Sequence, residues 1–121
     1  MRKIFLSLLV LVTISSIAQD LPKNYASLLK EVEPELIAWR RHFHEFPELS
    51  NREVNTGKYI ADFLNTLPNL EVRYPVAKTG VVAVLKGGKP GAVIALRADI
   101  DALPVYERVA IPFASKVTTE F

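Results

Sequence analysis

The chain has 121 residues, half of them hydrophobic, with 15 basic and 13 acidic side chains and no cysteine. This composition excludes a disordered chain, and the scattered basic residues, with a formal charge of only +2, exclude a nucleic-acid-binding surface. The length suits one small domain, which must be held together by its core because no disulfide can form.

The first 18 residues predict a secretory signal. Arg2 and Lys3 form a basic start, and the apolar run that follows is too short to span a bilayer. Ser16-Ile17-Ala18 supplies the small residues that a signal peptidase reads, so we expect cleavage before Gln19. The mature protein is then exported to the periplasm or beyond the cell, with no stable membrane anchoring. Retention of residues 1–18 as an anchor is the alternative.

Two helices are predicted next. From about Tyr25 to Phe46, apolar residues recur at three- and four-residue steps. Pro34 implies either a kink or a second helix that begins there, and Pro47 ends the pattern. Residues 50–53, Ser-Asn-Arg-Glu, have the pattern of a capping box, which predicts the start of another helix that runs to about Leu67.

The strands are predicted from three short runs rich in β-branched residues. Leu70 to Tyr74 reads as a short strand. Val81 to Leu85 and Ala92 to Leu96 are continuously apolar, which is typical of strands that are covered on both faces. The turn at residues 87–91 is short enough to join these two runs as an antiparallel hairpin. The predicted class is α/β, and because two helices cover only one face of such a sheet, we expect an incomplete domain.

Asp99 and Asp101 follow the last predicted strand, where α/β folds place ligands. Two carboxylates in this position could ligate a divalent cation or orient a ligand, or they could simply end the strand in a turn. The two histidines, His42 and His44, are two residues apart on a predicted helix. This step points them in different directions, so they are not expected to bind one metal ion together. We expect His42 to face solvent and His44 to lie at the helix end, near the negative end of the helix dipole.

Two stretches carry a resemblance to a known family. Residues 39–49, WRRHFHEFPEL, followed by Glu53, resemble the first signature of the amidohydrolase branch of the aminoacylase/carboxypeptidase metallopeptidase family. Hippurate hydrolases and indole-acetyl-amino-acid hydrolases belong to this branch. Its second signature is similar to TGVV at residues 79–82 and to LRADIDALPV at residues 96–105 with Glu107.

The resemblance implies that residues 19–121 are the N-terminal part of a zinc-peptidase-like α/β catalytic domain, with a smaller lid domain inserted later. It implies a pair of divalent metal ions, zinc or manganese, that activate water to attack the amide bond of an N-acyl amino acid. It also allows a homodimer through the lid domain.

By the same resemblance, Asp99 is carried over as a metal-proximal catalytic residue. Other branches have a histidine metal ligand where this chain has Arg97. The branch's main metal-binding motif, His-Ala-Cys-Gly-His-Asp, is expected beyond Phe121, so the chain is expected to be truncated before it, to bind no metal and to be inactive. The alternative is a non-catalytic secreted binding module derived from the same fold.

Overall fold

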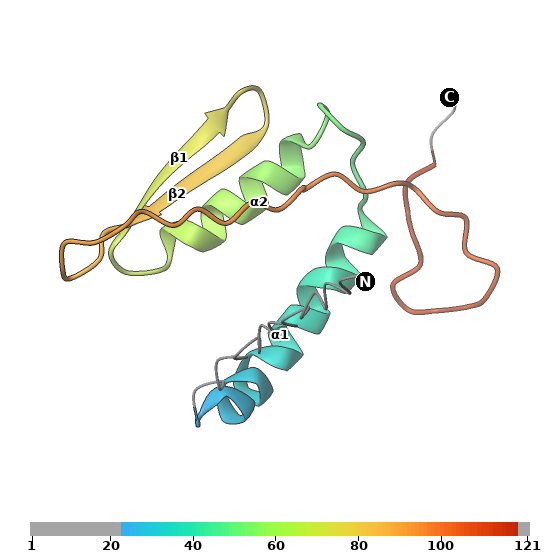
Figure 1. Cartoon of the computed structure of the whole chain (residues 1–121). Helices are drawn as coiled ribbons and strands as arrows, with labels where there is room; N and C mark the ends of the chain where they lie inside the picture. The colour runs from blue at the N-terminus through green and yellow to red at the C-terminus, as the bar shows by residue number, and fades with distance from the viewer. Residues whose placement is uncertain (1–22, 119–121) are drawn as a thin grey trace, which may run out of the picture.

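The computed structural model describes residues 23–118. The predicted signal sequence therefore lies outside the described residues. Two helices are followed by a two-stranded antiparallel sheet (Figure 1). This arrangement confirms the α/β class. In chain order, the elements are α1 (Tyr25–Glu45), α2 (Val54–Asn65), β1 (Leu70–Val76) and β2 (Gly80–Leu85).

Helix α1 is a single helix that runs through Pro34, so no second helix begins there. Its C-terminal half packs against α2: the ring centroids of Trp39 and Phe63 lie 4.8 Å apart, edge to face. Between residues 25 and 37, the large apolar side chains of the helix are 40 to 53% exposed, namely Tyr25, Leu28, Leu29, Val32, Leu36 and Ile37. The apolar stripe that predicted the helix is thus used for packing over only part of its length.

Strands β1 and β2 form the hairpin of this fold. Leu70 pairs with Leu85, and the register shifts between Arg73 and Val76. The three-residue turn between the strands has positive φ at Ala77 (48°) and Lys78 (86°). Helix α2 lies against this hairpin (Figure 1), and its Ala61 side chain is buried, with only 3% exposed.

Gly57 allows the close approach of α2 to the hairpin. A Cβ atom at this position would lie 2.3 Å from the carbonyl oxygen of Thr79 and 2.8 Å from the ring of Tyr74. Because a side chain of any size would collide with the backbone of the turn, only glycine fits here.

The predicted pairing of Val81–Leu85 with Ala92–Leu96 is wrong. The first run pairs with β1 instead, and residues 92–96 form no strand in the part of the chain that the structure describes. Val93 is 97% exposed and Leu96 is 96% exposed. The physical reason is that the short turn at residues 77–79 closes the hairpin with β1, while no described element covers either face of the second run.

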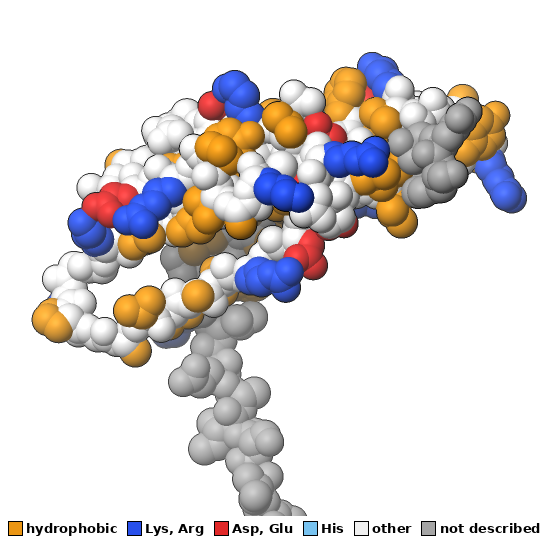
Figure 2. Space-filling view, turned by 90° about the horizontal axis from the view of Figure 1, so that it is seen from above, with side chains coloured by type: hydrophobic (Ala, Val, Ile, Leu, Met, Phe, Trp, Pro, Cys, Tyr) orange, Lys and Arg blue, Asp and Glu red, His pale blue; other side chains and the backbone are white. Residues whose placement is uncertain are grey.

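Residues 86–118 contain no helix or strand and run back past α2 toward the C-terminal end of α1 (Figure 1). Figure 2 shows hydrophobic side chains open to view on several parts of the surface, between scattered charged ones. Between residues 23 and 118, no helix combines the length and the apolarity that crossing a membrane would need.

Candidate functional site

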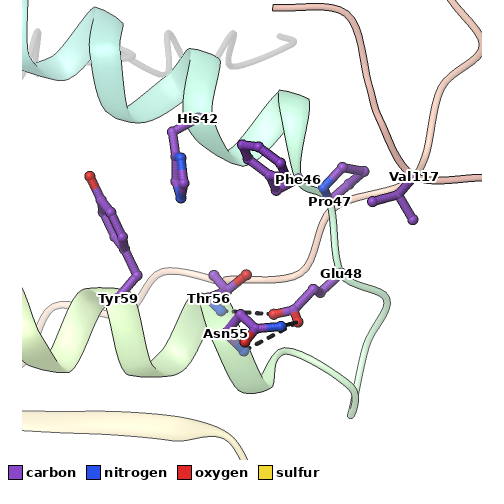
Figure 3. Close-up of a pocket in the computed structure, with 8 residues that line it drawn as sticks. All are labelled: His42, Phe46, Pro47, Glu48, Asn55, Thr56, Tyr59 and Val117. Atoms are coloured by element: carbon purple, nitrogen blue, oxygen red, sulfur yellow. Dashed lines mark hydrogen bonds between the residues drawn. The ribbon is translucent and has the colours of Figure 1, made fainter.

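The junction between α1 and α2 is organised by the carboxylate of Glu48 (Figure 3). One oxygen accepts hydrogen bonds from the backbone N–H of Asn55 (3.2 Å) and from its side-chain amide (2.8 Å). The other accepts from the backbone N–H of Thr56 at 2.7 Å. These N–H groups belong to the first turn of α2, where they have no partner within the helix. A side chain six residues before α2 therefore caps it.

The predicted capping box at Ser50 and Glu53 is wrong. Helix α2 begins at Val54, and neither residue caps it with its side chain. Instead, the buried Glu53 carboxylate accepts a 2.7 Å hydrogen bond from the hydroxyl of Thr79 and so ties the start of α2 to the hairpin turn. Positive φ at Asn51 (65°) turns the chain so that Glu48 can reach the helix end.

The pKa values of Glu48 and Glu53 both lie below that of an exposed glutamate. Burial raises the pKa of Glu48, but the hydrogen bonds from Thr56 and Asn55 together outweigh it, so its pKa lies below the ordinary value of 4.5. The hydrogen bond from Thr79 is the main cause that lowers the pKa of Glu53. Both carboxylates are therefore ionised at neutral pH.

A pocket of about 410 Å³ opens beside this junction; it is lined by His42, Phe46, Pro47, Glu48, Asn55, Thr56, Tyr59 and Val117 (Figure 3). His42 stacks on Tyr59, with ring centroids 4.4 Å apart and planes 22° apart. The sequence predicted a solvent-facing His42, but the structure half-buries it against α2. Because the Glu48 oxygens are already bonded to α2, the pocket walls are mainly aromatic and apolar.

Asp99 and Asp101 lie in the extended segment after β2, and both are exposed. The guanidinium of Arg97 donates to Asp99 at 2.6 Å, and the two side chains are 86 and 68% exposed. The structure does not bring the histidines to these aspartates. Among the described residues, no three His, Cys, Asp or Glu side chains form a group that could hold a metal ion. The residues present therefore do not fit a metal pair by themselves.

The sequence reasoning missed one side-chain contact that joins distant parts of the chain. His44 Nε2 contacts Glu107 Oε1, and the side chains are 35 and 18% exposed. Sequence reasoning placed His44 only at the helix end, near the negative end of the helix dipole. The available signal was that His44 and Glu107 belong to the two stretches that resemble one family.

Comparison with known proteins agrees with that resemblance. No family model matches the sequence. The chain is 47% identical over 89 residues to an N-acyl-L-amino acid amidohydrolase of Geobacillus stearothermophilus, covering 74% of this chain and 24% of the relative. It is 52% identical over 82 residues to an N-acetylcysteine deacetylase of Bacillus subtilis, covering 68% of this chain and 22% of the relative.

A solved structure extends the agreement to the fold. A dinuclear metal-binding peptidase of the M20 family from Bacillus subtilis superposes with a TM-score of 0.63 at 50% sequence identity, over 73% of this chain and 24% of that one. The chain belongs to the M20 family. The resemblance drawn from residues 39–49 and 96–105 is thereby confirmed.

The chain spans about a quarter of the length of the M20 relatives it matches. Helices α1 and α2 and the β1–β2 hairpin thus match a part of the M20 peptidase fold. The described residues contain the capped junction at Glu48 but no group of side chains that could hold a metal ion. The metal-proximal role of Asp99 stays a prediction.

Proposed function

We propose that the chain is part of an exported, metal-dependent amidohydrolase that cleaves the amide bond of N-acyl amino acids. The observation that carries this proposal is the identity of 47 and 52% to two relatives named for this kind of amide cleavage. The likeness to a dinuclear metal-binding peptidase supports divalent metal ions in the complete protein. Zinc or manganese is the proposed metal.

The metal ligands are proposed to come from residues outside the described part, because no suitable group of side chains lies within it. When bound, the metal pair would lower the pKa of water and polarise the amide carbonyl. Asp99, held by Arg97 beyond the end of β2, is proposed to stand near that pair. For residues 19–121 alone, we propose neither metal binding nor hydrolysis.

The complete protein tests this function. We expect it to hydrolyse N-acyl amino acids, to lose activity with a chelator, and to regain it with zinc or manganese. Asp99→Asn keeps the size and removes the charge, and it should reduce both turnover and metal content. Unchanged turnover and metal content would show that Asp99 is only a turn residue.

Residues 19–121 expressed alone supply the matched control. Calorimetric titration with zinc and with manganese should show no stoichiometric binding, and no hydrolysis should be detected. Micromolar binding with turnover would contradict the proposed position of the active site. A complete protein that binds N-acyl amino acids without cleaving them would instead favour a binding module.

Export and assembly need separate experiments. Mass spectrometry of the mature protein should find Gln19 at its N-terminus, and an N-terminus at Met1 or Arg2 would contradict export with cleavage. A homodimer through the lid domain is expected for the complete protein, and light scattering would measure its mass. A monomeric mass at micromolar concentration would contradict that assembly.

A further inference from the structure

Residues 102–116 are attached to the end of α1 and the turn after it at three points. The backbone N–H of Ala102 donates to the carbonyl oxygen of Glu48 at 2.8 Å, and the backbone N–H of Lys116 donates to the carbonyl oxygen of Glu45 at 2.8 Å. Between these two points lies the contact of His44 with Glu107. In Figure 1 this stretch forms the loop that begins and ends near the C-terminal end of α1.

Among residues 23–118, the contact of His44 with Glu107 is the best shielded contact between a basic side chain and a carboxylate. Its side chains are 35 and 18% exposed, whereas those of Lys58 and Asp62 are 65 and 63% exposed. Water and salt weaken an exposed pair, so such a pair stabilises little. A contact with a largely buried carboxylate is screened less by water and salt. Its loss costs more free energy, because the buried carboxylate is then left without a hydrogen-bond donor.

One aromatic ring packs beside the His44 ring. The ring of Phe113, near the C-terminal end of the loop, lies edge to face with the His44 ring at 5.9 Å between centroids. The guanidinium of Arg41 lies 4.8 Å from the centroid of the same Phe113 ring. Lys116 at the end of the loop pairs with Glu45. The loop is thus held by the contact of His44 with Glu107, beside which Phe113 packs, and by the more exposed pair of Lys116 and Glu45.

We propose that His44 is a positioning residue, which holds Glu107 and through it the loop of residues 102–116 against the end of α1. The attachment fixes the path of the chain that follows Asp99. In the amidohydrolase proposed above, on which this part of the inference rests, His44 acts through Glu107 and touches neither substrate nor metal.

The 121-residue chain tests the attachment without any activity. Amide hydrogen exchange of Lys116, whose N–H is bonded to Glu45, reports opening of the loop. His44→Ala and Glu107→Ala should each speed this exchange about three- to tenfold, the range expected for a partly exposed charged hydrogen bond. The double variant should open no further than the worse single variant. Unchanged exchange, or additive effects, would overturn the proposal.

Two controls separate the loop from the fold. Lys58→Ala removes an exposed pair elsewhere and should leave the Lys116 amide unchanged. The amide of Gly57, bonded to the carbonyl oxygen of Glu53 at 2.9 Å, should stay protected in every variant. If His44→Ala also speeds exchange of the Gly57 amide, a double variant with His44→Glu and Glu107→His, in which the two side chains are swapped, distinguishes loss of the loop contact from loss of the fold. Restored protection of the Lys116 amide in the swapped chain supports the proposal, and an amide that stays unprotected overturns it.

The complete enzyme tests the consequence for catalysis. His44→Ala should lower kcat with little change in KM, and His44→Gln, which keeps a hydrogen-bond donor, should restore most of it. Equal losses in both variants would contradict a positioning role. A complete protein without any hydrolysis would refute the proposed function and leave the exchange result of the shorter chain standing.

Discussion

The carboxylate of Glu48 accepts a 2.7 Å hydrogen bond from the backbone N–H of Thr56, the third residue of α2. The same glutamate's backbone carbonyl accepts from Ala102, which lies beyond the hairpin. One residue between the two helices therefore fixes both the start of α2 and the return of the distant segment. A negative charge at the positive end of the helix dipole adds to this arrangement.

Removal of the Glu48 cap should destabilise the chain. Glu48→Ala leaves the first-turn N–H groups of α2 without their charged acceptor, and loss of a helix cap costs about 1 kcal/mol in the free energy of unfolding. Urea denaturation followed by circular dichroism measures it. Glu71→Ala, which removes an exposed pair with Lys86, is the matched control and should cost less than about 0.5 kcal/mol. Equal losses in the two variants would contradict a capping role.

Stability should fall in acid because Glu48 and Glu53 both have a pKa below the ordinary value of 4.5. A group whose pKa is lower in the folded chain contributes stability above its unfolded pKa and loses it as the pH falls through the folded pKa. The contribution of these two groups to the free energy of unfolding should therefore stay constant from neutral pH down to about 4.5. Below that pH it should decrease. Glu48→Gln should make this drop shallower. An unchanged profile would show that Glu48 does not contribute.

Gly57→Ala should destabilise the chain although alanine favours helices. Alanine gains about 1 kcal/mol over glycine inside a helix. Here its Cβ would lie 2.3 Å from the backbone oxygen of Thr79, so α2 must move away from the turn. Overpacking of this kind costs about 1–3 kcal/mol, and loss of the Glu53–Thr79 hydrogen bond adds to that cost. We expect a net loss of about 1–2 kcal/mol by urea denaturation.

Gly88→Ala is the control for that change, since nothing lies within 4 Å of a Cβ at Gly88. It should change the free energy of unfolding by less than about 0.5 kcal/mol. A stabilised Gly57→Ala chain would mean that helix and hairpin are not in this close contact.

Val93→Asp should leave the stability of this chain within about 0.5 kcal/mol, because Val93 is 97% exposed here. The apolar run predicted a strand that is covered on both faces in the complete protein, where the same change would bury an unpaired charge. A more soluble chain with an unchanged midpoint of urea denaturation is the expected result. A loss of several kcal/mol would show that the 92–96 run is packed in solution after all.

The local pattern of the sequence was sufficient for the elements that depend on neighbouring residues. The three- and four-residue spacing from Leu28 to Phe43 predicted α1, and the short run at Leu70–Tyr74 predicted β1, because amphipathic spacing and β-branched composition act within one turn or one strand. The signature residues around Trp39 and Asp99 were also sufficient for the family.

The tertiary structure alone decided which of those elements meet. The partner of β2, the cap of α2 and the contact of His44 with Glu107 join residues up to 63 positions apart, and no periodicity encodes such a distance. Ser50 and Glu48 both offered an oxygen to α2, and the turn at Asn51 brought Glu48 to the helix end. An acceptor is chosen by where the backbone carries it, and that path depends on packing between elements.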